Sequence, residues 1–226
     1  MPTTKINSGK RLAQVLIVDD HPVVRRGLRE LIAQTPDLMV CGEADDLPEA
    51  LDQVKTTQPD VAVVDISLKS GSGIELIKQI KAMHPQVKML VSSVYDESLY
   101  AERALRAGAM GYINKEEALD SIIEAIRQVL GGRVYLSGDM TNRMLHRSIT
   151  GQRPEQSTVD ALSSRELEVF ELIGRGFTTS QIAGKLHRSV KTIEAHRENI
   201  KRKLRVDSAP ELMRYAIQWV QFGGAG

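Results

Sequence analysis

Residues 15–28 read VLIVDDHPVVRRGL, a run of four apolar residues that meets two aspartates and then an amphipathic stretch. A run this short and this rich in Val, Ile and Leu predicts a strand buried on both faces of a sheet. Helical patterns separate this run from four similar ones along the chain. The four are MVCG at 39–42, VAVVDI at 61–66, VKMLV at 87–91 and MGYI at 110–113.

Five repeats of strand and helix predict an α/β fold, a doubly wound five-stranded parallel sheet with helices on both faces. Pro36, Pro59 and Pro85 follow three of the helical stretches, at the positions where proline ends a helix. The pair Gly131-Gly132 closes the last helix. We place this domain at residues 12–136.

The composition is that of a globular protein with one or two domains. Of the 226 residues, 42% are hydrophobic and 26% are charged, which excludes a disordered or collagen-like chain. No apolar run approaches the roughly 18 residues that cross a bilayer, and Met1–Leu12 lacks the apolar stretch of a secretory signal. The single cysteine, Cys41, lies in an apolar run, which predicts a buried thiol in a reducing compartment. We expect a cytoplasmic protein with no membrane partner.

The chain changes character after residue 136. Residues 137–160 are expected to form a linker with a short helix, because 148–160 read SITGQRPEQSTVD, a polar segment with Gly and Pro. Residues 161–222 show helical patterns only. Ser163, Thr178 and Ser208 each precede Glu or Gln by three residues, the spacing of a capping box, and Ser189 is a fourth candidate N-cap. Four short helices, the middle two joined by a tight turn, predict a helix-turn-helix domain.

Polar side chains follow four of the predicted strands. Asp19 and Asp20 follow the first strand, Asp65 the third, Ser93 the fourth and Lys115 the fifth. Because the carboxyl ends of parallel strands meet at one edge of a sheet, we expect these groups to converge there. Each residue alone is common as a loop, cap or solvated group. Their joint placement at four strand ends favours a site.

Three clustered carboxylates repel one another and need a cation to stay ionised. An all-oxygen site with room for water suits Mg²⁺. A carboxylate beside such a metal can attack a phosphoryl group and become an aspartyl phosphate. The metal and Lys115 would offset the charge that arrives, and Ser93 would donate a hydrogen bond to a phosphate oxygen.

The segments VLIVDDHPVVRRGL, VAVVDISLKSGSG, KMLVSSVYDE and RAGAMGYINK resemble the receiver domain of two-component response regulators, which has a flavodoxin-like fold. The resemblance implies that Asp65 is the phosphate acceptor. It implies a metal site made of Asp19, Asp20, Asp65 and the backbone carbonyl of Ser67. It also implies that Ser93 and Tyr112 are the switch pair and that Lys115 is the phosphate-sensing lysine. Receivers commonly have proline where this chain has Lys69, a departure that affects the loop after Asp65.

A basic stretch lies in the helical domain. Lys185–Arg205 contains 8 basic and 2 acidic residues, although the whole chain has a net charge of +1. Such a patch is the footprint of a polyanion; the alternative is a solvated helix face. The pattern of Val190–Leu204 predicts one helix, in which Ile193, Ile200 and Leu204 are buried. The N-terminal part of this helix could enter a major groove. Its last basic residues are expected to contact phosphates: Lys201, Arg202, Lys203 and Arg205.

Residues 162–206, LSSRELEVFELIGRGFTTSQIAGKLHRSVKTIEAHRENIKRKLRV, closely resemble the LuxR-type DNA-binding domain, so the whole chain resembles a NarL/FixJ-type response regulator. The last helix, 209–220, either supplies a dimer face through Met213 and Ile217 or closes the small core. The implied DNA contacts are Thr178, Thr179, Ser189, Lys191, Thr192, Glu194, Ala195, His196, Glu198, Lys201 and Arg202.

The resemblance implies a transcription regulator that uses Mg²⁺, takes its phosphoryl group from a sensor histidine kinase and binds double-stranded DNA as a homodimer on activation. It implies no metabolic enzyme, although a receiver catalyses its own phosphoryl transfer. Two alternatives remain: a constitutive DNA-binding module with an unphosphorylated receiver, and a phosphatase-type enzyme. The intact set of strand-end residues argues against the first. Ser67, at the position where such a phosphatase has a second aspartate, argues against the second.

Overall fold

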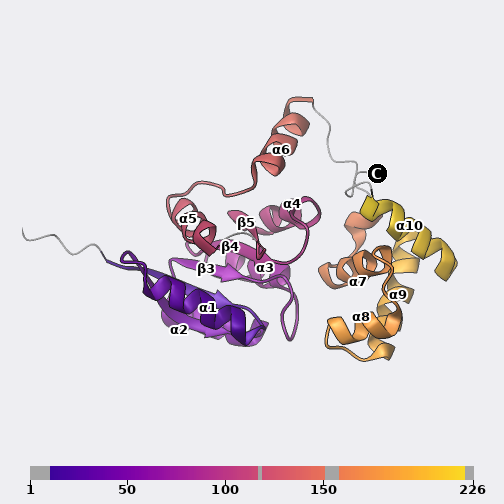
Figure 1. Ribbon diagram of the computed structural model, residues 1–226, viewed down its shortest axis with the longest axis horizontal. Coiled ribbons are helices and arrows are strands. Elements are labelled where there is room, and N and C mark those ends of the chain that lie inside the picture. The colour runs from indigo at the N-terminus through magenta and orange to yellow at the C-terminus, as the bar shows by residue number, and fades with distance from the viewer. Residues whose placement is uncertain (1–10, 117–118, 151–157, 222–226) are drawn as a thin grey trace, which may run out of the picture. The chain divides into compact units, whose positions relative to one another are not determined.

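The computed structural model describes residues 11–116, 119–150 and 158–221. They belong to two compact units (Figure 1). Of the described residues, one unit comprises those within 11–94 and 104–135, and the other comprises those within 95–103 and 136–221. No helix within these described ranges is both long enough and apolar enough to span a membrane.

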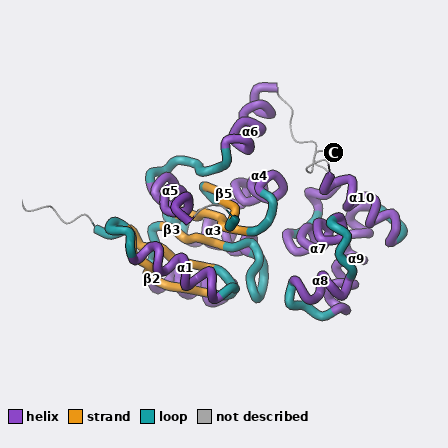
Figure 2. Tube along the Cα trace, viewed as in Figure 1, coloured by secondary structure: helices purple, strands orange, loops and turns teal. Residues whose placement is uncertain are grey.

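The first unit contains the five-stranded parallel sheet that the sequence predicts (Figure 2). The strands lie in the order β2-β1-β3-β4-β5, so the chain reverses its direction of winding after β2. This order confirms the doubly wound α/β fold. The strands are β1 (Ala13–Val18), β2 (Leu38–Ala44), β3 (Val61–Val64), β4 (Lys88–Ser93) and β5 (Gly111–Asn114).

A helix follows each strand, and the local sequence explains where several of them begin. Proline in the first turn opens α1, and the side chains of Asp46 and Ser72 accept hydrogen bonds from the first-turn amides of α2 and α3. These caps satisfy backbone N–H groups that have no partner within the helix. The helices are α1 (Pro22–Ala33), α2 (Leu47–Thr57), α3 (Gly73–Met83), α4 (Glu97–Ala107) and α5 (Leu119–Leu130).

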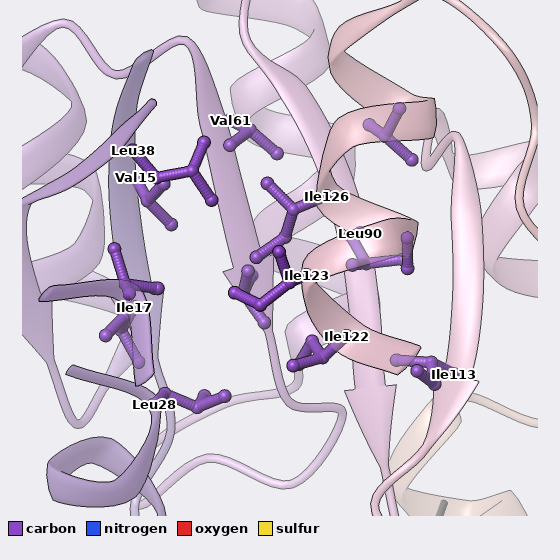
Figure 3. Close-up of a cluster of buried hydrophobic side chains, with 14 residues drawn as sticks. Val15, Ile17, Leu28, Leu38, Val61, Leu90, Ile113, Ile122, Ile123 and Ile126 are labelled. Carbon is purple, nitrogen blue, oxygen red and sulfur yellow. The ribbon is translucent and has the colours of Figure 1, made fainter. Parts of the chain in front are cut away.

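One face of the sheet is packed against α1 and α5. Val15 and Ile17 of β1 point into this layer, where they join Leu28 of α1 and Ile122 and Ile126 of α5 (Figure 3). The intervening residues Leu16 and Val18 are also fully or almost fully buried, and alternation along a strand turns them to the opposite face. Both faces of β1 are therefore covered, as its continuous apolar run predicts.

The expectation that every strand is buried on both faces is wrong for β2. This strand lies at the edge of the sheet, and five of its seven residues are partly or well exposed. Cys41 is accordingly half-buried, and its Sγ lies 3.5 Å from the hydroxyl of Thr57. Burial is the largest influence on this thiol and raises the pKa of Cys41.

The second unit contains the helices that follow α5, together with Tyr95–Arg103. The short helix expected within residues 137–160 is a full α6 of 13 residues. After it come a 3₁₀ turn and four helices, which confirms the all-helical character of the C-terminal part. The elements are α6 (Gly138–Thr150), η1 (Thr158–Ala161), α7 (Ser164–Gly174), α8 (Thr179–Lys185), α9 (Val190–Leu204) and α10 (Ala209–Gln221).

The predicted caps begin these helices. Ser163 and Thr178 form reciprocal capping boxes with Glu166 and Gln181, and Ser189 caps α9 through the amide of Thr192. The hydroxyl of Ser208 accepts from the amide of Glu211, but the Glu211 carboxylate accepts from Asp207 rather than from Ser208. Helix α10 therefore begins at the predicted cap, but the side chain of Glu211 accepts its hydrogen bond from the amide of the residue before that cap.

A small aromatic and aliphatic core holds this unit together. Phe170 of α7 stacks at an angle on Trp219 of α10, with ring centroids 5.5 Å apart. Ile193, Ile200 and Leu204 of α9 are buried, which confirms the stripe that the sequence assigns to the inner face. Helix α9 is thereby fixed against α7 by one side, and its other side is left to solvent.

We predict that Gly73→Ala destabilises the first unit. A Cβ atom at this position would overlap the carbonyl oxygen of Asp65, and overpacking costs about 1–3 kcal/mol. Gly27→Ala in α1 is the matched control, because its Cβ would meet nothing within 4 Å and alanine stabilises a helix by about 0.5–1 kcal/mol over glycine. Urea unfolding followed by circular dichroism measures both. Equal stability of the two variants would contradict the prediction.

Candidate functional site

Three aspartates meet at the carboxyl edge of the sheet. Asp19 and Asp20 follow β1, and Asp65 follows β3. Ligand atoms of these carboxylates and of His21 all lie within 4.8 Å of one another. Asp19 and Asp65 are each only 2% exposed. The structure thus brings together the acidic residues that the strand ends predict.

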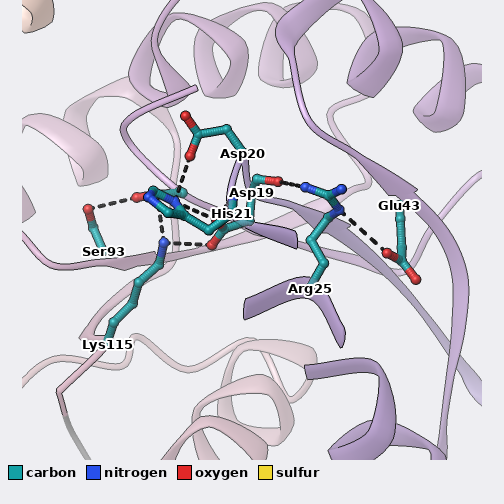
Figure 4. A network of polar contacts seen from close by, with 8 residues as sticks. Asp19, Asp20, His21, Arg25, Glu43, Ser93 and Lys115 are labelled. Atoms are coloured by element: carbon teal, nitrogen blue, oxygen red, sulfur yellow. Dashed lines mark hydrogen bonds and ion pairs between the residues drawn. The ribbon is translucent and has the colours of Figure 1, made fainter. Parts of the chain in front are cut away.

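Lys115 and Ser93 complete this cluster from the other half of the sheet (Figure 4). The Lys115 ammonium lies 2.6 Å from Asp19 Oδ2 and 2.6 Å from Asp65 Oδ2. The Ser93 hydroxyl donates to Asp65 Oδ1 at 2.8 Å. Both oxygens of the Asp65 carboxylate are therefore held by groups from the ends of β4 and β5. Tyr112, on β5, is fully buried.

Burial and charge act against each other in this cluster. Burial is the largest influence on Asp65 and raises the pKa of its carboxyl, although the Lys115 charge opposes the shift. Burial would lower the pKa of the Lys115 ammonium, but the charges and hydrogen bonds of Asp65 and Asp19 outweigh it and raise that pKa. Lys115 therefore stays protonated and supports the charge of the buried carboxylates.

The cluster fits a hard divalent cation. It offers carboxylate oxygens from three aspartates, which is the donor type that Mg²⁺ prefers. A single ammonium, that of Lys115, bridges two of them, so ionisation of all three leaves negative charge that a cation would balance. His21 lies beside the aspartates, with Nδ1 2.7 Å from Asp20 Oδ1, and was not predicted as a member. Ser67 pairs with Ser72 in an isolated bridge, and a metal contact of its carbonyl stays a prediction.

Lys69 shows what replaces proline in the loop after Asp65. Its backbone N–H donates to the carbonyl of Asp45 at 3.3 Å, a bond that proline could not make. Its ammonium lies 3.5 Å from the Asp45 carboxylate, with the side chain 71% exposed. The amide of Leu47 donates to Ser70, so two backbone bonds fasten this loop to the loop after β2.

Arg25 contacts the site and Glu43 contacts Arg25, although neither was predicted from the sequence. The Arg25 guanidinium donates to the backbone carbonyl of Asp19 at 2.5 Å, and its Nε lies 3.5 Å from Glu43 Oε2 (Figure 4). Arg25 lies in the quoted segment VLIVDDHPVVRRGL, but arginines on an amphipathic helix are usually solvated. Glu43 lies on β2, and its spacing from Asp19 in the sequence carries no signal.

A second candidate site is the solvent side of α9. Five of the implied DNA contacts are exposed and share one helical face: Lys191, Glu194, Ala195, Glu198 and Arg202. Thr192, His196 and Lys201 are partly exposed beside them. Thr178 and Ser189 cap α8 and α9, and Thr179 opens α8. The predicted DNA contacts therefore lie along α9 and at the N-termini of α8 and α9.

The basic residues at the end of α9 differ in what they contact. Lys203 donates to Glu166 at 2.6 Å, so its ammonium is paired within the unit, and its contact with a DNA phosphate stays a prediction. Lys201 lies 2.9 Å from Glu198, and Arg202 donates to Asn199 within α9. Burial, and next the charge of Arg165, lower the pKa of His196.

Helix α10 packs one side against α7 and exposes the other. Leu212, Ala216 and Trp219 are buried, so this helix closes the small core. Met213 is 41% exposed, and Ile217 is partly exposed. Core closure is thus shown, and a dimer face at Met213 and Ile217 stays a prediction.

Two family models match the chain. The response regulator receiver domain matches residues 15–127. The luxR family of bacterial regulatory proteins matches residues 160–216. The first match spans the sheet with its acidic cluster, and the second spans the helices α7 to α9 and the start of α10.

Relatives cover nearly the whole chain. Oxygen regulatory protein NreC of Staphylococcus carnosus is 39% identical over 91% of this chain and 97% of its own, and the protein of that name from Staphylococcus haemolyticus is 36% identical over the same shares. A structure of RcsB from Salmonella typhimurium has a TM-score of 0.61 at 28% identity, covering 92% of this chain and 98% of that one. RcsB bound to promoter rprA with phosphomimetic BeF3⁻ has a TM-score of 0.58 at 28% identity, over 92% and 99%.

We predict that Lys203→Met lowers the stability of the second unit in a pH-dependent way. Burial would raise the pKa of Glu166, but its bonds to Lys203 and Ser163 outweigh it and hold that pKa below the ordinary 4.5. The ionised pair therefore stabilises the fold above pH 4.5, by about 1 kcal/mol, and loses this effect as the pH falls through the folded pKa.

The single tryptophan, Trp219, lies in this unit and reports its unfolding in urea. The difference between wild type and Lys203→Met should be full at pH 7 and shrink below pH 4.5. Arg202→Met, one position away, is the control and should change little. A stability loss that is the same at both pH values would show that the ion pair is not its cause.

Proposed function

The chain belongs to the two-component response regulators that carry a receiver domain and a LuxR-type domain, and we propose that phosphorylation of Asp65 controls its binding to DNA. This family consists of regulators rather than enzymes that turn over a metabolite. The observation that carries the proposal is the buried Asp65 carboxylate, held at one oxygen by Ser93 and at the other by Lys115.

The donor in the proposed reaction is a phosphohistidine of a sensor kinase or a small acyl phosphate. A carboxylate oxygen of Asp65 attacks the phosphorus, the bond from phosphorus to the donor nitrogen or oxygen breaks, and an acyl phosphate forms on Asp65. The leaving group takes the electron pair of the broken bond. Lys115 lies where its ammonium can pair with the added phosphate oxygens.

Asp19, Asp20 and Asp65 would hold Mg²⁺, together with the backbone carbonyl of Ser67. When bound, Mg²⁺ supplies charge neutralisation for the transferring phosphoryl group. The ammonium of Lys115 now bridges Asp19 and Asp65, so it already provides one positive charge at this edge.

The added group changes the contacts that Ser93 and Lys115 make. A phosphoryl group brings about −1.5 to −2 charges and strong acceptor oxygens. Ser93 now donates to Asp65, and in the phosphorylated protein it would donate to a phosphate oxygen instead. Tyr112, fully buried on β5, is the proposed second member of the switch. Movement of these residues would favour the active state of a two-state surface.

The exposed face of α9 is the proposed DNA-binding element. RcsB, a relative of known structure, has been seen as two dimers bound to two parallel DNAs and on a promoter with a phosphomimetic. By analogy, this chain would bind two half-sites as a dimer, about one helical turn apart. Glu194 and Ala195 would face base edges, and Lys201 and Arg202 would contact phosphates.

These roles define the parts of the chain. We propose a receiver at residues 12–136, a linker at 137–160 that contains α6, and a DNA-binding domain at 161–222. Both DNA and the kinase domain that would donate the phosphoryl group are in the bacterial cytoplasm, where we expect the protein to act. The second candidate is a constitutive DNA-binding module. In such a protein the acidic cluster would have no role.

We predict that acetyl phosphate with Mg²⁺ adds one phosphoryl group to the wild-type chain and none to Asp65→Ala. The matched control is Asp60→Ala, which removes a carboxylate outside the acidic cluster and leaves Asp65 in place. Intact-mass spectrometry detects the adduct, and light scattering in the same samples should show a shift toward dimer. An adduct that persists in Asp65→Ala would place the modification elsewhere.

We predict that Arg202→Ala weakens DNA binding with a smaller salt dependence. Loss of one phosphate contact lowers the slope of log affinity against log salt by about 1 and weakens binding to all sequences alike. Lys78→Ala on α3 removes an exposed charge from the other unit and should leave the slope unchanged. Fluorescence anisotropy at several salt concentrations gives both slopes. Identical slopes for wild type and Arg202→Ala would show that Arg202 contacts no phosphate.

A further inference from the structure

The backbone of Asp19 is held on both of its sides. Its N–H donates to the carbonyl of Ala44 on β2 at 3.0 Å. Its own carbonyl accepts from the Arg25 guanidinium at 2.5 Å. Because Asp19 is almost fully buried, a carbonyl without this partner would lack the hydrogen bond that buried backbone groups require.

Arg25 reaches back to this carbonyl from the first turns of α1. The helix begins at Pro22, and the amide of Arg25 donates to the carbonyl of His21 at 3.2 Å. This bond fixes Arg25 next to the loop that carries Asp19 and Asp20. The side chain is only 18% exposed. A planar guanidinium with several donors can serve two acceptors at once.

The second acceptor is Glu43 on the edge strand. Its Oε2 lies 3.5 Å from Arg25 Nε, and its Oε1 lies 2.9 Å from Arg29 Nη1. Glu43 therefore joins β2 to two successive turns of α1. Figure 4 shows the chain of contacts that runs from Glu43 through Arg25 and Asp19 to Lys115.

We propose that Arg25 is a positioning residue for the metal site: it fixes the Asp19–Asp20 turn in the geometry that binds a divalent cation, and Glu43 orients Arg25. This inference rests on the proposed function of the acidic cluster. Arg25 contacts the backbone of Asp19 and not its carboxylate, so it acts on the place of the ligand and is no ligand itself. Such supporting contacts matter because a metal site needs its donors held in place before the ion arrives.

Arg29 provides a control that separates the effect of the bond to the Asp19 carbonyl from the effect of the positive charge beside Glu43. Arg29 also pairs with Glu43, one turn further along α1, and has no hydrogen bond or ion pair with Asp19 among the described residues. Arg29→Met and Arg25→Met remove the same charge from the same glutamate. Only the second removes the bond to the Asp19 carbonyl.

The experiment measures cation binding directly, without phosphorylation. Mn²⁺ replaces Mg²⁺ as a spectroscopic probe, and the free ion is counted by electron paramagnetic resonance in titrations of the full chain. Arg25→Met should weaken Mn²⁺ binding about 10-fold, the size of effect that loss of a supporting contact has in metal sites. Arg29→Met should stay within about twofold of wild type by the same scale. Glu43→Gln should fall between them.

Phosphorylation by acetyl phosphate gives a second readout. If Arg25 positions the site, Arg25→Met needs more Mg²⁺ for half-maximal adduct formation but approaches the wild-type rate at saturating Mg²⁺. Arg25→Lys keeps the charge and one donor, so it should restore part of the affinity even if Arg25→Met folds poorly. Circular dichroism checks the fold of each variant.

Three outcomes would overturn the inference. Mn²⁺ affinity of Arg25→Met equal to wild type would show that the bond to Asp19 does not position the metal ligands. Equal losses in Arg25→Met and Arg29→Met would assign the effect to charge. A lower rate at saturating Mg²⁺ with unchanged Mn²⁺ affinity would place Arg25 in the phosphoryl transfer. Failure of the wild-type chain itself to bind Mn²⁺ or accept a phosphoryl group would instead overturn the proposed function.

Discussion

Two buried carboxylates, those of Asp19 and Asp65, share the ammonium of Lys115 at 2.6 Å each. Burial of such charges is costly unless they are paired, so the three residues must arrive together from three different strand ends. A parallel sheet with the order β2-β1-β3-β4-β5 does this, because β1, β3 and β5 end at the same edge. The site thus depends on the topology, and the register of each strand sets which side chain reaches it.

Several elements around this cluster hold its loops in place. Helix α3 begins so close to Asp65 that position 73 has no room for a side chain. The loop after Asp65 is fastened through Lys69 and Leu47. Arg25 and Glu43 hold the other loop from α1 and β2. Many of these supporting contacts are hydrogen bonds to backbone groups. Residues of other chemical types than those of the cluster can therefore make them.

Much of the fold and the cluster follows from local patterns. Apolar runs of four to six residues predicted the strands, and the residues directly after them predicted the members of the site, because strand ends in a parallel sheet coincide. Contacts between distant elements carried no such signal. The edge position of β2 leaves Cys41 half-buried, the ammonium of Lys203 pairs with Glu166 of another helix, and Arg25 turns inward from an amphipathic helix. Each depends on packing that a single sequence does not display.

The central claim is that chemistry at Asp65 changes what the exposed face of α9 binds. The most direct test is the affinity of the full chain for promoter DNA, at one fixed salt concentration, with and without BeF3⁻ and Mg²⁺. We expect tighter binding only when both reagents are present, and no change in Asp65→Ala. Equal affinity of the wild-type chain under all conditions would contradict it and leave a DNA-binding protein that works without its receiver.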